Sequence, residues 1–352
     1  MSSLKVAVAG SSQYSQQMAQ ILAQHPQFDI TWVLTPQAKA RGRQQTVTDN
    51  PLAAWAQQQE LTIFRVAKKI DQQLITQLKQ SSIDILLVVD FGYLIPQNLL
   101  ELPKLAPLNI HPSLLPKWRG SSPGQFSLLW QHLTRPYRGQ VIGGNGAGIS
   151  LIMMNQTLDQ GDIVTQLPLT IDSKWNQTQY YDQAFQLMAE QLAKQLLQLA
   201  QGQSQAQPQP ITSPTPTARQ LQKSDGFVSW PHLQILMADQ SRSISSEDKQ
   251  HPVKQKPKNK QLLSDLLTAR GCLGDYSLTR TEQVQLVADA CRALAPWPGL
   301  WTSLTIKDKV VRMKILSCRA MQGQNSYLKL ETIQLEGKTA YNFKQVQDNL
   351  LT

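Results

Sequence analysis

The sequence predicts an α/β fold, with a first domain built on a parallel-rich sheet and a smaller β-rich domain after it. Three observations predict this arrangement. Short apolar runs alternate with helical patterns over the first 200 residues, which is typical of βαβ units with right-handed crossovers. Beyond residue 217 short alternating runs appear that are typical of antiparallel strands. The chain has 352 residues, and at about 150 residues per domain this length indicates two domains.

The elements of the first domain follow from hydrophobic periodicity. Apolar, β-branched runs predict strands at residues 5–9, 28–34, 61–65, 83–89, 108–110, 148–154 and 163–169. Helical spacing predicts helices at residues 13–23, 71–79 and 176–200, and Pro51 suits the first position of another helix. In the second domain, residues 310–315 and 327–333 alternate as strands of a small antiparallel barrel would.

Composition sets the domain boundaries. We expect a first domain at residues 1–201, a linker at residues 202–217 and a second domain at residues 218–352. The linker consists almost entirely of Gln, Pro, Ser and Thr, which predicts an extended segment. A polar insertion near residues 239–260 lacks the apolar residues that a core requires, so we expect it to be disordered.

The overall composition excludes several classes of protein. Three cysteines cannot hold together a disulfide-rich secreted scaffold of this size, and they lack metal-ligand spacing, so no metal is expected. No apolar run approaches the roughly 18 residues of a membrane span. The sequence starts directly in a strand pattern without a visible signal peptide, so we expect a cytoplasmic protein with no membrane association.

Positive charge is distributed unevenly along the chain. The 34 Lys and Arg against 24 Asp and Glu give a net charge of +10, of which +3 falls on residues 1–207 and +7 on residues 208–352. A basic second domain is suited to a polyanion such as nucleic acid. The alternative is that part of this charge, on Lys254, Lys256, Lys258 and Lys260, only keeps the insertion solvated.

The turn after the first strand does not predict dinucleotide binding. Residues 10–14 read GSSQY, which lacks the G-x-G-x-x-G pattern, and no acidic residue ends the second strand.

The densest chemical feature is NIHPSLLPKWRG at residues 109–120. Asn109 and His111 are two residues apart on a predicted strand, so their side chains face the same way at the carboxyl edge where α/β sheets bind ligands. Asp159 follows in the loop between two later strands and could orient the imidazole. Together the amide, imidazole and carboxylate fit acyl transfer, with Asn109 donating to an oxyanion and His111 supplying a proton or positive charge. The same spacing also fits a structural turn asparagine and a hydrogen-bonded histidine.

These motifs resemble those of the 10-formyltetrahydrofolate-dependent formyltransferases. The resemblance extends over residues 1–232 and 283–350, so it is not limited to one segment. The motifs that carry it are NIHPSLLPKWRG with the following SPGQ, LDQGD at 158–162, VAVAG at 6–10, DFGYLIP at 90–96, DGFVSW at 225–230 and RALAPWPG at 292–299. It implies a Rossmann-like formyltransferase domain followed by an OB-like barrel.

The resemblance also implies an activity and a set of site residues. A formyl group would pass from 10-formyltetrahydrofolate to the amino group of methionyl initiator tRNA, in a monomeric enzyme of translation initiation. Asn109, His111 and Asp159 would be the catalytic trio. The folate would contact Ser113, Leu114, Leu115, Pro116 and Gly161, with Phe91, Leu94 and Ile95 lining its pterin slot. Those three apolar residues fit the core equally well.

A basic loop and three departures complete the comparison with the family. Residues 35–43 resemble the loop that enters the tRNA acceptor stem, with Lys39, Arg41 and Arg43 on phosphates. A solvated surface loop would have the same composition. The departures are a glycine-rich stretch at 137–148, the insertion at about 235–282, and the turn at 11–14, which lacks the usual proline and acidic residue.

Other activities remain open from the sequence. A formyltransferase acting on the amine of a sugar nucleotide would share the first domain and have no need of a basic second one. A formyl-folate hydrolase would use the same trio with water. A glycinamide ribonucleotide formyltransferase would have little use for residues 208–352. A non-catalytic RNA-binding module on the same fold would not need the trio at all.

Overall fold

The computed structural model describes residues 3–41, 46–133, 136–137, 140–141, 146–238, 262–267, 278–323 and 326–346. The chain divides into two compact units. The first unit comprises residues 1–120, 147–170 and 181–213, and the second comprises residues 121–146, 171–180 and 214–352. The second unit therefore includes two segments that come from within the predicted first domain.

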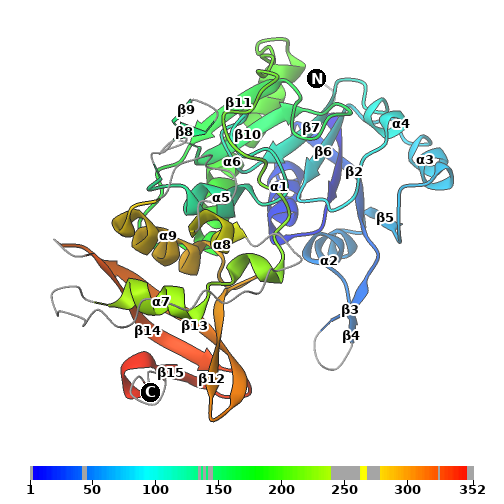
Figure 1. Ribbon diagram of the computed structural model, residues 1–352. Coiled ribbons are helices and arrows are strands. Elements are labelled where there is room, and N and C mark those ends of the chain that lie inside the picture. Colours follow the sequence, from blue (N-terminus) through cyan, green and yellow to red (C-terminus); the bar gives the residue numbers. More distant parts are fainter. Residues whose placement is uncertain are drawn as a thin grey trace. The chain divides into compact units, whose positions relative to one another are not determined.

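A seven-stranded, mostly parallel sheet forms the centre of the first unit (Figure 1). Its strands lie in the order β11-β10-β7-β6-β1-β2-β5. They are β1 (Leu4–Gly10), β2 (Phe28–Pro36), β5 (Thr62–Val66), β6 (Ile85–Val89), β7 (Ala106–His111), β10 (Gly148–Met153) and β11 (Ile163–Pro168). The five strands from β7 to β5 run parallel, whereas β10 is antiparallel to β7 and β11 is antiparallel to β10. The predicted α/β fold with a parallel-rich sheet is confirmed.

Three helices of this unit begin where a local side chain satisfies a free backbone N–H group. Ser12, Asn50 and Asp71 are the N-caps of α1, α2 and α3, and each side chain accepts a hydrogen bond from the backbone N–H three residues on. The helices are α1 (Gln13–Ala23), α2 (Pro51–Gln58), α3 (Gln72–Leu78), α4 (Gln97–Leu100) and most of α6 (Gln177–Ala200). The helices α1 and α2 pack beside one another and against β2 (Figure 1).

Burial explains why the central strands read as unbroken apolar runs. All five residues of β6 are buried, as expected for a strand with both sheet faces covered. By contrast, β7 alternates buried and partly exposed residues, and its last residues carry the polar side chains of the site. A short hairpin, β3 (Lys39–Arg41) with β4 (Thr46–Thr48), follows β2.

The second unit contains a four-stranded antiparallel sheet in the order β12-β13-β14-β15 (Figure 1). Its strands are β12 (Leu300–Ile306), β13 (Lys309–Met321), β14 (Tyr327–Leu335) and β15 (Ala340–Asn342). Its other elements are α5 (Pro123–Leu129), β8 (Pro136–Tyr137), β9 (Gln140–Val141), the 3₁₀ helix η1 (Lys223–Gly226), α7 (Trp230–Met237), α8 (Leu262–Leu267) and α9 (Arg280–Ala293). The helices α7 and α9 pack against the sheet, and α5 packs against α9. The predicted antiparallel strands at the C-terminal end are confirmed.

Two of the quoted motifs, DGFVSW and RALAPWPG, meet inside this unit. Asp225 is fully buried, and a Cβ on Gly226 would lie only 1.8 Å from the carbonyl oxygen of Gly299, so that contact requires glycine. The rings of Phe227 and Trp301 pack in a tilted arrangement, with their centroids 4.8 Å apart. These motifs therefore hold η1 against the start of β12.

The buried carboxylate of Asp289 makes the stability of the second unit depend on pH. It accepts hydrogen bonds from His132 Nδ1 at 2.8 Å and from Arg292 Nη2 at 2.6 Å. The hydrogen bond to Asp289 raises the pKa of His132, against the effect of partial burial, which lowers it. Because the folded state binds this proton more tightly than the unfolded state, the stabilisation is complete below about pH 6.5 and is lost as the pH rises through the raised pKa.

We therefore expect the denaturant midpoint of the second unit to fall as the pH is raised above about 6.5. Chemical unfolding monitored by tryptophan fluorescence across this range measures it. The variant His132→Gln should flatten the dependence, and the matched variant His25→Gln in the first unit should keep it. A wild-type midpoint that stays constant or rises over this range would contradict the assignment.

Candidate active site

Asn109 and His111 lie at the carboxyl end of β7, opposite β10. In the antiparallel register, Asn109 pairs with Ile152 and His111 with Ser150. His111 is 5% exposed, while Asn109 is partly exposed, and within the described part of the chain no hydrogen bond to the Asn109 side chain is recorded. The Asn109 amide is therefore available to a substrate oxygen.

Asp159 reaches the imidazole from the loop between β10 and β11. Its Oδ1 lies 3.6 Å from His111 Nδ1, and its Oδ2 accepts a hydrogen bond of 2.8 Å from the backbone N–H of Gly120. The other ring nitrogen, Nε2, lies 3.1 Å from the carbonyl oxygen of Trp118. Both ring nitrogens thus face oxygen atoms, which fixes the orientation of the imidazole.

The structure thus brings Asp159 to His111, and Asn109 lies two residues before His111 on β7, so the two face the same side of the strand. Asp159 is 8% exposed and has a left-handed backbone with φ of 55°. A non-glycine residue in this region persists only where its surroundings hold it, and such residues are concentrated at functional sites. The hydrogen bond from Gly120, at the end of the NIHPSLLPKWRG motif, is one of the contacts that hold it.

The turn at Ser113–Pro116 is tied firmly to the sheet. The hydroxyl of Ser150 donates to the carbonyl of Ser113 at 2.6 Å and accepts from the backbone N–H of Leu115 at 3.2 Å. The side-chain amide of Gln166 donates to the carbonyl of Leu115 at 2.8 Å. Leu114 is half-buried in the same turn. The turn is thus fixed to the sheet just after His111, and its contact with folate stays a prediction.

The three apolar residues predicted beside the pterin lie in different environments. Phe91 and Ile95 are partly buried and pack against the core cluster of the first unit. Leu94 is 88% exposed. None of the three lines the pocket described next, and their contact with a ligand also stays a prediction.

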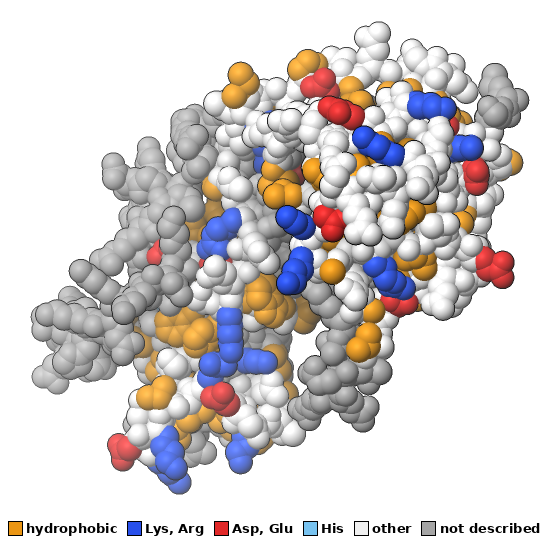
Figure 2. Space-filling model, turned by 90° about the vertical axis from the view of Figure 1, so that its right-hand side faces the viewer, with side chains coloured by type: hydrophobic (Ala, Val, Ile, Leu, Met, Phe, Trp, Pro, Cys, Tyr) orange, Lys and Arg blue, Asp and Glu red, His pale blue; other side chains and the backbone are white. Residues whose placement is uncertain are grey.

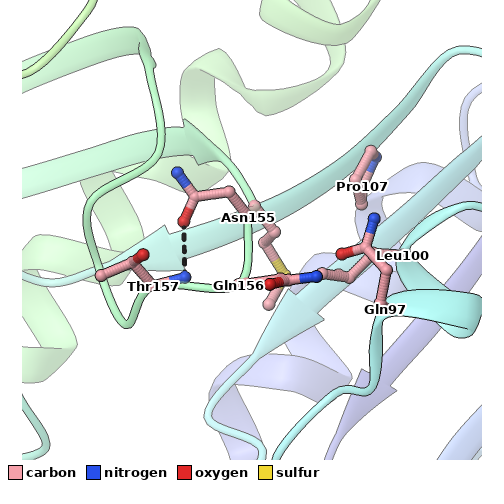
Figure 3. A pocket seen from close by; sticks show the side chains of 7 residues that line it. Gln97, Leu100, Pro107, Asn155, Gln156 and Thr157 are labelled. Carbon is pink, nitrogen blue, oxygen red and sulfur yellow. Dashed lines mark hydrogen bonds between the residues drawn. The ribbon is translucent and has the colours of Figure 1, made fainter.

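A pocket of about 430 Å³ opens in the first unit, between α4, the start of β7 and the loop after β10 (Figure 3). It is lined by Gln97, Leu100, Pro107, Met154, Asn155, Gln156 and Thr157. The backbone N–H of Thr157 donates to Asn155 Oδ1 at 2.8 Å, which fixes the shape of the loop (Figure 3). Pro107 lies two residues before Asn109 on β7, so the two face the same side of the strand.

Sequence reasoning missed this set of lining residues. Its amides and its hydroxyl are scattered over α4 and the β10–β11 loop, and no spacing pattern relates them before the chain is folded. The one available signal was the position of the loop, immediately before LDQGD.

Position 161 requires glycine because the backbone there lies very close to the backbone at the end of β10. A Cβ at this position would lie 1.6 Å from the carbonyl oxygen of Met153, closer than any real contact. The loop that carries Asp159 therefore folds back against the end of β10 only with glycine at position 161.

Two of the three predicted tRNA-contacting residues lie on the β3–β4 hairpin. Lys39 and Arg41 belong to β3, which pairs with β4 through Lys39 with Thr48 and Arg41 with Thr46. Arg43 lies outside the described residues. Parts of the glycine-rich stretch and most of the predicted insertion also lie outside them.

Two general features of the described residues bear on the site. They contain no group of three or more His, Cys, Asp or Glu side chains placed to hold a metal ion. No helix in the described part of the chain combines the length and apolar character needed to cross a membrane.

The doubly wound sheet places an amide and an imidazole at the carboxyl end of β7, the edge at which α/β sheets bind ligands, with a carboxylate from the β10–β11 loop beside the imidazole. Residues 4–205, more than half of the chain, match the model of the family described as formyl transferase. The chain belongs to the formyl transferase family.

Curated relatives specify the family further. The chain is 28% identical to the methionyl-tRNA formyltransferase of Staphylococcus aureus (strain JH1) over 242 residues, 68% of this chain and 73% of the relative. It is 30% identical to the methionyl-tRNA formyltransferase of Ehrlichia ruminantium (strain Welgevonden) over 175 residues, 49% of this chain. That match spans 53% of the relative, about half of its length.

Solved structures agree in fold. A sugar 3N-formyl transferase determined in the presence of dTDP and 5-N-formyl-THF superposes with a TM-score of 0.53 at 13% identity, covering 96% of this chain and 99% of that one. The N-formyltransferase of Helicobacter canadensis, in complex with folinic acid and dTDP-3-aminofucose, gives 0.52 at 13% identity, covering 91% and 89%. At this identity, the likeness concerns the fold alone.

The close approach at Gly161 yields a prediction about activity. We expect Gly161→Ala to lower kcat for formyl transfer by about 10- to 100-fold, because the added methyl group displaces the loop that carries Asp159. Gly92→Ala is the matched control, since a Cβ there meets no atom within 4 Å. Steady-state kinetics of both variants measure the effect, and equal kcat values for the two would contradict it.

Proposed function

We propose that this enzyme transfers the formyl group of 10-formyltetrahydrofolate to the amino group of methionyl initiator tRNA. The observation that carries the proposal is the match to the Staphylococcus aureus methionyl-tRNA formyltransferase. At 242 residues it is longer than the family segment at residues 4–205 and so extends past it. The similarity thus includes more than the part that all members of the family share.

The trio has the groups that this reaction needs. The α-amine of the methionyl ester would attack the formyl carbon, and negative charge would develop on the formyl oxygen. When this charge returns to the carbonyl, the bond from the formyl carbon to the folate nitrogen would break, and that nitrogen would take the proton lost by the amine. The open amide of Asn109 can donate a hydrogen bond to that oxygen, which is the contact that most strongly stabilises such a transition state. His111 supplies positive charge beside it, and Asp159 orients the ring and balances that charge.

The donor fits the pocket that begins two residues before Asn109. Folate carries a flat heterocycle with ring nitrogens, an amine and a carbonyl along its edge. The pocket offers three side-chain amides and a hydroxyl beside the apolar surfaces of Leu100, Pro107 and Met154. This mixture of apolar walls and a few directed polar groups is typical of small-molecule sites. When bound there, the donor supplies the activated formyl group.

The C-terminal sheet has a surface suited to RNA. Lys and Arg side chains are spread over the face in Figure 2, its lower part included. The exposed basic residues of the C-terminal sheet, its turns and the residues just after β15 are Lys307, Lys309, Lys314, Arg319, Lys329, Lys338 and Lys344. Beside them, Arg312 lies over the ring of Trp301, with 5.1 Å from its guanidinium carbon to the ring centroid. Basic groups next to an aromatic ring can contact both phosphates and bases. We further propose that Lys39, Arg41 and Arg43 contact the acceptor stem.

A panel of acceptors tests the proposal. The protein is incubated with 10-formyltetrahydrofolate and either methionyl initiator tRNA, an amino-sugar nucleotide, or no acceptor, and the formylated product is identified by mass spectrometry. We expect formylation of the methionyl-tRNA. Formylation of the amino sugar, release of formate in the absence of an acceptor, or RNA binding without turnover would each replace the proposal with the corresponding alternative.

A further inference from the structure

The segment Gln207–Ser213, which we call the strap, is fixed against the catalytic loops of the first unit. At one end, the backbone N–H and C=O groups of Gln207 and Ile163 exchange two hydrogen bonds of 2.8 Å. At the other end, the hydroxyl of Ser213 donates to the carbonyl of Pro116 at 2.8 Å. The composition of residues 202–217 predicts an extended linker, and the structure shows that this part of it is anchored at both ends.

In the middle of the strap, Gln209 touches the loop that carries Asp159. Its Nε2 donates to the backbone carbonyls of Asp159 at 3.1 Å and of Gly161 at 2.6 Å. A primary amide has two N–H groups, so one side chain satisfies both carbonyls. Gln209 is thus bonded on both sides of residue 160, at the point where the backbone of Asp159 is left-handed.

Arg119 holds the other end of the same amide. Its Nε and Nη2 donate to Gln209 Oε1 at 3.3 and 2.9 Å. It also donates to the carbonyls of Pro210 at 2.7 Å and Ile211 at 3.0 Å. Arg119 is 8% exposed, and burial lowers the pKa of its guanidinium, while the negative charge of Asp159 acts in the opposite direction. The rigid fork of a guanidinium leaves little freedom to the strap that it binds.

These contacts close a ring around the catalytic carboxylate. Gly120 donates to the carboxylate of Asp159, Arg119 is the residue before Gly120, and Gln209 joins Arg119 to the backbone of Asp159. Asp159 is therefore held through both its side chain and its main chain.

We propose that Gln209, oriented by Arg119, is a positioning residue that holds Asp159 against His111 for formyl transfer. The inference rests on the proposed function for its kinetic readout. Without the two hydrogen bonds from Gln209, the loop loses two of the contacts that hold Asp159 in its left-handed conformation. The carboxylate then moves away from the imidazole. Displacements of about 1 Å at a catalytic group can lower the rate by about 100-fold.

The matched pair Gln209→Ala and Gln207→Ala tests the proposal. The two glutamines lie two residues apart on the strap, but the side chain of Gln207 is exposed. Among the described residues, this side chain donates only to the carbonyl of Gln205, at 3.5 Å. We expect Gln209→Ala to lower kcat by about 10- to 100-fold with the KM of both substrates and the Tm near wild type. Gln207→Ala should leave kcat unchanged.

A double-mutant comparison separates positioning from a general loss of structure. If Gln209 acts through Asp159, then Gln209→Ala should have no further effect on the residual single-turnover rate of an Asp159→Asn enzyme. The same fold-loss in both backgrounds would overturn the proposal, because it would mean that Gln209 acts independently of the carboxylate. An unchanged kcat in Gln209→Ala alone would also overturn it.

If the proposed function is wrong, the wild-type protein will not formylate methionyl-tRNA. The role of Gln209 in holding the Asp159 loop is then tested by hydrogen exchange of the backbone amides at residues 157–162. Faster exchange in Gln209→Ala than in wild type and Gln207→Ala would support the strap as the restraint on Asp159. Equal exchange in all three proteins would overturn it.

Discussion

Replacing Asn109 with alanine is expected to lower kcat for formyl transfer by about 100- to 1,000-fold. The reason is that its amide is the one trio group without a recorded hydrogen bond within the described chain, and it faces the side of β7 that also carries His111. A donor placed for a developing oxyanion is worth about 3–4 kcal/mol of barrier. Steady-state kinetics with methionyl initiator tRNA measure the loss.

The control for this prediction is Asn109→Asp, which keeps the size of the side chain and removes the N–H donor. If packing were the role of Asn109, the aspartate variant would retain activity and the alanine variant would lose stability as well as rate. We expect both variants to be impaired, with an unchanged Tm. Near-normal turnover of Asn109→Ala would show that the amide does not contact the reacting oxygen.

Replacing Asp225 with alanine is expected to destabilise the second unit by about 3–5 kcal/mol. Its carboxylate is fully buried and accepts two hydrogen bonds from Arg219, at 2.8 and 2.6 Å. It also accepts from the backbone N–H groups of Gln222 at 2.6 Å and Leu262 at 3.0 Å. Alanine would remove the acceptor of the two backbone N–H groups and the charge that balances Arg219, and unsatisfied buried donors are costly.

Urea unfolding, followed by the fluorescence of the tryptophans in this unit, measures the effect. Glu336→Ala is the matched control, since this acidic side chain is exposed and its change should alter stability by less than about 0.5 kcal/mol. A midpoint for Asp225→Ala equal to that of Glu336→Ala would mean that the buried carboxylate does not support the link between η1 and α8.

The parallel sheet could be predicted because its strands are buried on both faces. Residues 83–89 form a continuous apolar run, and β6 occupies Ile85–Val89 within it, with every residue buried. The helix predicted at residues 13–23 is α1, whose start is signalled by Ser12 as the N-cap. Local chemistry determines such elements, so the sequence shows them directly.

The proximity of Asn109 and His111 could also be predicted, because two residues on one strand have a fixed relation. The contact between Asp159 and His111 could only be suggested. It depends on β10 running antiparallel to β7, and strand order and direction are tertiary properties that no periodicity encodes. The loop position of Asp159 made the contact possible, and the resemblance to a known family implied it.

Gln209 could not have been found from spacing. It lies in a stretch of Gln, Pro, Ser and Thr that is typical of linkers, and 50 residues separate it from Asp159. Its contacts arise only when the strap folds back over the site. Arg119 belongs to the NIHPSLLPKWRG motif, but its hydrogen-bond partners could not be predicted from the motif. A side chain that acts by positioning another residue has no characteristic spacing in a single sequence.

One measurement tests the central claim most directly. A labelled formyl group on 10-formyltetrahydrofolate is followed in a single turnover with excess enzyme and methionyl initiator tRNA, comparing wild type with Asn109→Ala. We predict that the label appears on the methionyl α-amine with the wild-type enzyme and forms about 100- to 1,000-fold more slowly with the variant. No label on the tRNA with wild type, or equal rates for the two proteins, would contradict the account.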